Sequence, residues 1–137
     1  MGPTRIGFTG SRAGMQPAQA ETIIRVLDAH SSLVVLHGDC IGADTDFHNL
    51  CVAYRSAHPE KYIKIHVYPP INPQLRGFNV ADKTLELNHY LERNKAIVLN
   101  SDFLIACPVD KNKAEVRSGT WSTVRQARRH GIPVRIL

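Results

Sequence analysis

The chain has 137 residues, of which 43% are hydrophobic and 21% are charged, and its formal net charge is +5. This length fits a single domain with one core, and the balance of apolar and charged residues excludes a globally disordered chain. The apolar runs are too short to span a bilayer and no signal-peptide pattern opens the sequence, so we expect a cytoplasmic protein with no membrane partner.

The three cysteines and seven histidines form no pattern typical of a disulfide scaffold or a zinc site. There is no CxxC pair and no HExxH motif, so we expect no metal and no cofactor. Charge is distributed unevenly, because no acidic residue follows Glu115. The arginines after that point are Arg117, Arg125, Arg128, Arg129 and Arg135. Such a basic end suits a partner that carries phosphate, and it equally suits a solvated helix face.

The first half of the chain predicts three strands with two helices between them. The apolar run 6–8 predicts the first strand, and apolar residues spaced three and four apart predict a helix over 20–27. The run 33–36 is typical of a strand buried on both faces. A helical stripe follows over 43–54, and alternation over 63–68 predicts a half-buried third strand.

The second half begins with prolines, which predict a loop over 69–80. A loop this long in a small domain is more often functional than accidental. Helical periodicity returns over 81–98 and directs the amide of Asn94 toward the core. The remaining residues predict a strand at 103–107, a helix at 120–129 ended by Gly131, and a strand at 134–137.

Strands that alternate with helices indicate the α/β class. We expect residues 1–137 to form a single Rossmann-like domain with a doubly wound, mostly parallel five-stranded sheet and helices on both faces. The strand order that we expect is 3-2-1-4-5. In such a sheet a ligand binds beyond the carboxyl ends of strands one and four, where the winding reverses.

Three glycine-containing turns lie where a predicted strand gives way to a helix. Glycine lets backbone N–H groups approach an anion, and the following helix adds the positive end of its dipole. The turns predict a phosphate site made of Thr9, Gly10, Ser11, Arg12, Gly38, Gly42, Ala43, Arg117, Ser118, Gly119 and Thr120. Taken singly, each turn is also explained by helix capping. The pattern is neither GxGxxG nor GxxxxGK[ST], which excludes ordinary dinucleotide oxidoreductases and P-loop NTPases.

Asp39 and Asp44 are the acidic residues nearest this edge and are the candidate catalytic residues. Either carboxylate can hold a ribose or position a water molecule. Asp44 also suits the first turn of its helix, where the dipole favours a negative charge. Trp121 shares the inward stripe of the last helix, so we expect it in the core, where its first-turn position would also let it stack on a base.

Four motifs that follow one another in order resemble the SLOG superfamily, most closely its small YspA-like members, over nearly the whole chain. The superfamily's segments read "TGSR", "hGgA.GAD", "RN … sD.lia" and "GT … A … G.PV". The matching stretches here are 9–12, 37–44, 93–94 with 102–106, and 118–121 with 131–134. The resemblance implies a Rossmann-like fold and a nucleotide-related ligand, and it is compatible with a homo-oligomer.

The superfamily includes cytokinin-activating phosphoribohydrolases, the DNA-processing protein DprA and sensors of nucleotide-derived signals. In the phosphoribohydrolases a PGGxGTxxE motif supplies a glutamate that takes part in cleaving the N-glycosidic bond. Here Thr123 stands in the glutamate's place, and Val116 and Arg117 replace the first two glycines. A threonine hydroxyl is a poor general acid or base near neutral pH. Thr123 is therefore counted with the predicted ligand contacts.

Three functions stay open at this point. The first is a ligand-binding or sensor domain for a nucleotide or nucleotide derivative. The second is hydrolysis of an N-glycoside of a nucleoside monophosphate, with Asp44 or Asp39 as the acidic group. The third is single-stranded nucleic-acid binding, which the basic end suggests. Aromatic residues are only 7% of the chain and do not interleave with the arginines, so this third function ranks last.

Overall fold

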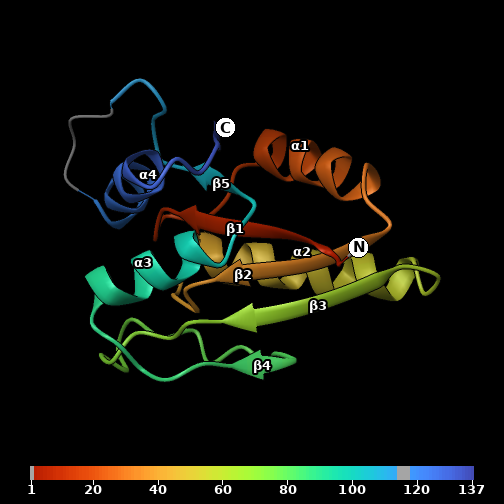
Figure 1. Ribbon diagram of the computed structural model, residues 1–137, viewed down its shortest axis with the longest axis horizontal. Coiled ribbons are helices and arrows are strands. Elements are labelled where there is room, and N and C mark those ends of the chain that lie inside the picture. The colour runs from red at the N-terminus through yellow and green to blue at the C-terminus, as the bar shows by residue number, and fades with distance from the viewer. Residues whose placement is uncertain (1, 114–117) are drawn as a thin grey trace.

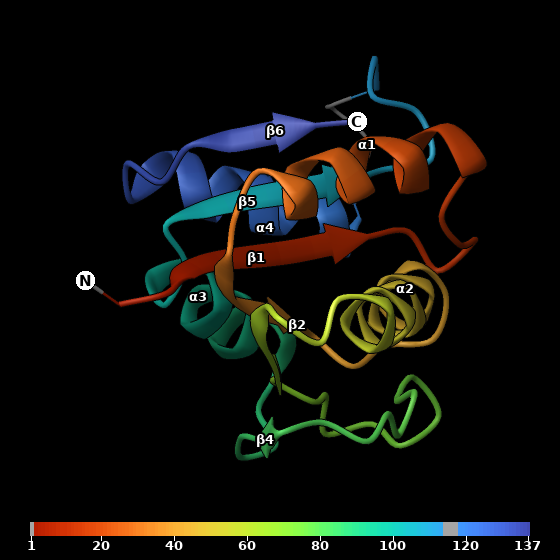
Figure 2. The same cartoon turned by 90° about the vertical axis from the view of Figure 1, so that its right-hand side faces the viewer.

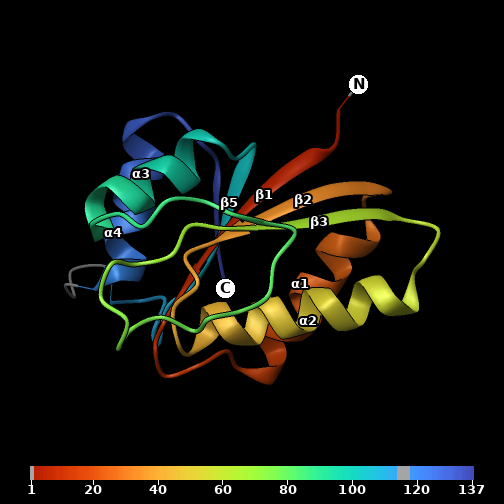
Figure 3. The ribbon, with the colours of Figure 1, turned by 90° about the horizontal axis from the view of Figure 1, so that it is seen from below.

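A parallel sheet with two helices on each face organises the protein (Figure 1). The computed structural model describes residues 2–113 and 118–137. The elements are β1 (Thr4–Gly10), α1 (Pro17–Asp28), β2 (Ser32–His37), α2 (Ala43–Ala57), β3 (Tyr62–Val67), β4 (Lys83–Thr84), α3 (Tyr90–Leu99), β5 (Phe103–Cys107), α4 (Gly119–Arg129) and β6 (Val134–Ile136). Figures 2 and 3 show α1 and α2 on one face of the sheet and α3 and α4 on the other.

The sheet has six strands in the order β4-β3-β2-β1-β5-β6, and all neighbours are parallel. The prediction of five strands in the order 3-2-1-4-5 was wrong, because β4 adds a further edge strand beside β3. The predicted α/β class with a mostly parallel sheet is confirmed. The long loop predicted over 69–80 contains no helix or strand.

The extra strand lies where the sequence predicted the start of a helix over 81–98; α3 begins only at Tyr90. The amides of Asp82 and Leu85 donate to the carbonyls of Ile65 and Val67, so the chain follows the edge of β3 instead of coiling. The Asp82 carboxylate also accepts the Ile65 amide at 2.8 Å. Edge pairing therefore satisfies backbone groups that a helix would have satisfied internally.

Two layers of apolar side chains hold the helices on the sheet. The larger layer lies under α1 and α2 and contains the stacked rings of Phe8 and Phe47, whose centroids are 4.2 Å apart. The layer under α4 contains Trp121 and Val124, and a smaller cluster lies under α3. Among the described residues no helix is long and apolar enough to cross a membrane.

Candidate functional site

A pocket of about 1430 Å³ opens at the carboxyl ends of the strands. It lies where β1 and β5 are neighbours, and these strands lead to α1 on one face and to α4 on the other (Figure 2). The chain winding reverses at this point, and in doubly wound sheets ligands bind there. The pocket wall includes nine of the predicted residues, which are Thr9, Gly10, Ser11, Arg12, Asp44, Ser118, Gly119, Thr120 and Trp121.

The turn after β1 is hydrogen-bonded to the start of α2 and packs closely against it. The Ala43 amide donates to the Ser11 carbonyl at 2.9 Å, and Gly42, with φ 91°, lies directly against the backbone of Arg12. A Cβ on Gly10 would come within 2.5 Å of the Ala43 Cβ. Gly42 and Ala43 do not line the pocket. Their position explains instead why the two turns meet at one rim.

The first turn of α4 presents backbone donors to the pocket. Ser118 caps the helix by accepting the Trp121 amide at 3.2 Å. The amides of Gly119 and Thr120, which both line the pocket, donate to no group in the part of the chain that the structure describes. Two N–H groups at the positive end of a helix dipole can bind an anion.

Thr123 does not line the pocket. Its hydroxyl donates to the Gly119 carbonyl at 2.8 Å, and the side chain is 1% exposed, so it braces the first turn of α4. The prediction that Trp121 lies in the core is confirmed, because it is 3% exposed, and it also forms part of the pocket wall. Arg117 lies outside the described residues.

Cationic side chains surround the mouth of the pocket. The pocket lining includes Arg12, Lys113 and Arg125. Asp110 is an acidic residue of the same lining. This excess of positive charge would raise the local concentration of a phosphate-bearing ligand. No group of three or more His, Cys, Asp or Glu residues that could hold a metal ion occurs among residues 2–113 and 118–137.

Asp44 lies in the first turn of α2 and lines the pocket, although it is only 6% exposed. Burial raises the pKa of its carboxyl to about 6, and the Cys40 amide and the Arg93 charge act in the opposite direction. The Cys40 N–H donates to the carboxylate at 3.2 Å. A carboxyl with a pKa near neutrality can serve as a proton donor or acceptor.

Replacement of Asp44 by asparagine should remove a loss of stability that grows as pH rises. Because the folded pKa lies above the ordinary value of 3.8, ionisation of Asp44 opposes folding, and this loss develops as pH rises from 4 through about 6. We expect Asp44→Asn to gain about 2 kcal/mol relative to wild type between pH 4 and pH 7. Urea unfolding at both pH values measures this gain. An unchanged difference between the two proteins would contradict the raised pKa.

Asp39, the other candidate catalytic residue, lies outside the pocket lining and is fully buried. Its carboxylate pairs with the Arg76 guanidinium at 3.1 Å and accepts the backbone and side-chain N–H groups of Asn79 at 3.0 and 2.9 Å. These contacts tie the long loop after β3 to the end of β2. In this arrangement the Asp39 carboxylate holds a loop in place and does not line the pocket.

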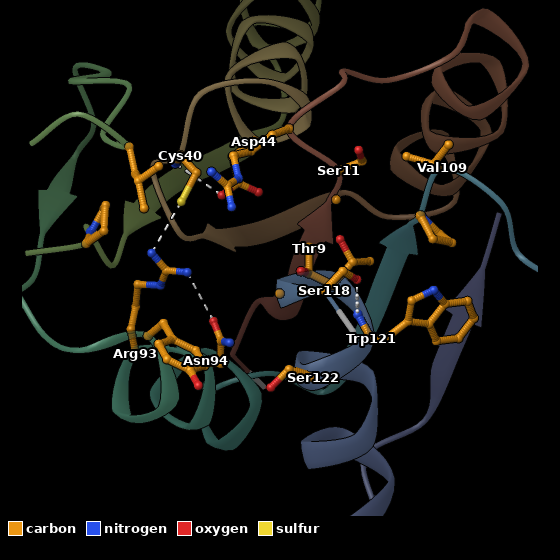
Figure 4. A pocket seen from close by; sticks show the side chains of 18 of the residues that line it. Thr9, Ser11, Cys40, Asp44, Arg93, Asn94, Val109, Ser118, Trp121 and Ser122 are labelled. Atoms are coloured by element: carbon orange, nitrogen blue, oxygen red, sulfur yellow. Dashed lines mark hydrogen bonds between the residues drawn. The ribbon is translucent and has the colours of Figure 1, made fainter. Parts of the chain in front are cut away.

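The pocket also contains Cys40, Arg93 and Asn94, which the predicted set did not include. Arg93 donates to the Cys40 sulfur at 3.3 Å and to the Asn94 Oδ1 at 3.3 Å (Figure 4). The sequence signals for this group were the amide on the apolar stripe of the predicted helix and the motif at 93–94. Asn94 is 3% exposed. Gly38, also predicted, lies between Asp44 and Arg93 without lining the pocket.

No protein-family model and no curated protein matches the chain. Among solved structures, the molybdenum cofactor binding protein from the phototrophic bacterium Rippkaea orientalis aligns with a TM-score of 0.64 at 22% identity, over 99% of this chain and 77% of that one. The X-ray structure of TM1055, a structural genomics target, aligns with a TM-score of 0.58 at 15% identity, over 96% and 72%. These likenesses show that the chain has a Rossmann-like α/β fold.

Proposed function

We propose that this chain is a ligand-binding or sensor domain of the SLOG type, which holds a nucleotide or nucleotide-derived ligand in the pocket at the carboxyl ends of its strands. The observation that carries the proposal is the pair of amides at Gly119 and Thr120, which have no acceptor among residues 2–113 and 118–137. They lie at the positive end of α4, in a pocket wall shared with Ser11 and Arg12. A phosphate group matches these donors in charge and in hydrogen bonding.

The size and lining of the pocket support a ligand larger than phosphate alone. Its volume of about 1430 Å³ exceeds the usual range for small-molecule pockets, which is about 300–1,000 Å³. Apolar groups of Trp121, Pro108 and Val109 lie in the same wall as the helix terminus. They can cover a base or sugar while the amides hold the phosphate. The likeness in fold to a molybdenum cofactor binding protein is consistent with a small-ligand role.

A substitution at the first residue of α4 tests the proposal. Gly119→Pro removes one amide donor, and proline suits this position because the preceding Ser118 is extended, with φ −153° and ψ 162°. Gly119→Ala is the matched control, since a Cβ at Gly119 meets no atom within 4 Å and the amide is retained. We expect Gly119→Pro to weaken nucleotide binding about tenfold, because one charge-assisted hydrogen bond is lost. We expect Gly119→Ala to change the affinity little.

Isothermal titration calorimetry with AMP, GMP, ADP-ribose and inorganic phosphate measures these affinities. Equal circular dichroism spectra and unfolding midpoints for the two variants would show that α4 is intact in both. The proposal is wrong if no member of the panel binds at millimolar concentration. It is also wrong if proline and alanine at position 119 weaken binding equally.

Hydrolysis of an N-glycosidic bond is the second candidate function, and the raised pKa of Asp44 in the pocket wall favours it. Asp44 is the acidic residue on which it depends, since Asp39 is engaged by Arg76 and Asn79. Release of free base from the same nucleotides, abolished in Asp44→Asn, would support hydrolysis. Binding without base release would favour the sensor domain.

A further inference from the structure

One side of the pocket carries a polar group distinct from the α4 terminus. Figure 4 shows Cys40, Asp44 and Arg93 on one side of the pocket and Ser118 and Trp121 on the other. The Arg93 guanidinium is held by its bonds to the Cys40 sulfur and the Asn94 Oδ1, both at 3.3 Å. Its direction is therefore determined before any ligand enters.

Two donors in this group have no acceptor among residues 2–113 and 118–137. The Arg93 Nε and the Asn94 Nδ2 are buried, and neither donates to any atom in the described part of the chain. The Asn94 side chain is 3% exposed, and both residues line the pocket. A buried donor without an acceptor costs about 1–3 kcal/mol, so native proteins pair nearly all such groups. Two of them in one pocket wall are suited to an acceptor that a ligand supplies.

An acceptor of the chain itself lies across from these donors. A Cβ on Gly38 would lie 3.1 Å from the Asp44 Oδ2 and 3.3 Å from the Arg93 Nε. Because position 38 is glycine, no side chain lies between the carboxylate and the guanidinium. The two charged groups do not close the gap with a direct ion pair. Asp44 accepts the Cys40 amide and keeps further lone pairs for another donor.

A group that fits this gap must accept from Arg93 or Asn94 and donate to Asp44. A phosphate or carboxylate group donates nothing and is repelled by Asp44, whereas an ammonium group accepts nothing and is repelled by Arg93. A hydroxyl group does both. We infer that this subsite binds the 2′ or the 3′ hydroxyl of the ligand's sugar, so a nucleotide that lacks that hydroxyl binds more weakly. The inference rests on the proposed function and names the ligand class of the same pocket.

The test compares each ribonucleotide that binds with its 2′-deoxy and 3′-deoxy counterparts by calorimetry. We expect loss of one of the two hydroxyls to weaken binding at least tenfold, because the donors and the acceptor are again left unpaired. Asn94→Leu keeps the size of the side chain and removes the donor. It should weaken binding of the ribonucleotide and leave unchanged the binding of the deoxynucleotide that lacks the recognised hydroxyl. Gly38→Ala, which fills the gap with a methyl group, should do the same.

Lys95→Ala provides a control on the same helix, because Lys95 is exposed and does not line the pocket. It should leave both the affinity and the preference for ribose unchanged. If ribonucleotides and both deoxy forms bind equally well, the hydroxyl subsite is wrong and the proposed function stands. If no nucleotide binds, both are wrong.

Discussion

Gly42→Ala is expected to destabilise the fold by about 4 kcal/mol, as the sum of backbone strain and steric overlap. Gly42 has φ 91° and ψ −130°, a conformation that side chains with a Cβ rarely adopt. A Cβ there would lie 2.5 Å from the Arg12 Cα and 2.6 Å from its carbonyl carbon. The Arg12 backbone cannot move aside easily, because the Ala43 amide bonds the Ser11 carbonyl next to it.

Gly131→Ala is the matched control for this substitution. Gly131 also has positive φ, at 71°, but a Cβ there meets no atom within 4 Å. We expect Gly131→Ala to lower the free energy of unfolding by about 1 kcal/mol, which is the cost of the backbone conformation alone. Urea unfolding of wild type and both variants at pH 7 measures the two decreases in the free energy of unfolding. Equal losses would contradict the view that the turns after β1 and β2 are packed backbone against backbone.

Acidification from pH 7 to pH 4 is expected to cost the folded state about 3 kcal/mol through His37. Burial, together with the nearby His48, lowers the pKa of His37 to about 3. Because the folded pKa lies below the ordinary value of 6.5, the neutral ring favours folding above pH 6.5 and this stability is lost as pH falls toward 3.

The hydrogen bonds around His37 explain why protonation is unfavourable. The His37 Nδ1 accepts the Asp39 amide at 3.0 Å, so its Nε2 carries the proton and donates to the His48 Nδ1 at 2.9 Å. The His48 Nε2 then donates to the Val80 carbonyl at 2.9 Å. A second proton on either ring would place two donors face to face within this chain of bonds.

A comparison of wild type with His37→Asn isolates the effect, because Asp44 shifts stability in the opposite direction over an overlapping pH range. Asparagine keeps an acceptor for the Asp39 amide and does not titrate. We expect the variant to be less stable at pH 7 and to gain about 3 kcal/mol relative to wild type by pH 4. Urea unfolding at four pH values from 4 to 7 measures this. A difference in stability between the two proteins that stays constant with pH would contradict a buried, neutral His37.

The sequence by itself determined the layered fold and the location of the pocket. The fully apolar runs 33–36 and 103–107 are typical of strands covered on both faces, and such strands occur in parallel sheets with helices above and below. Parallel strands end at the same edge, so the turns 9–12 and 118–120 had to meet at one rim. An amide on an apolar stripe was enough to send Asn94 inward.

Only the tertiary structure decided what each polar side chain at that rim contacts. Asp39 and Asp44 both follow β2 closely and look equivalent in sequence, yet Asp39 bonds to Arg76 and Asn79 while Asp44 lines the pocket. The same holds for β4, which lies within the helix predicted over 81–98 and pairs with the edge of β3 instead. In each case the partner lies far along the chain or on another strand. Local periodicity sets which face of an element is buried, and long-range contacts set which hydrogen bonds its polar groups make.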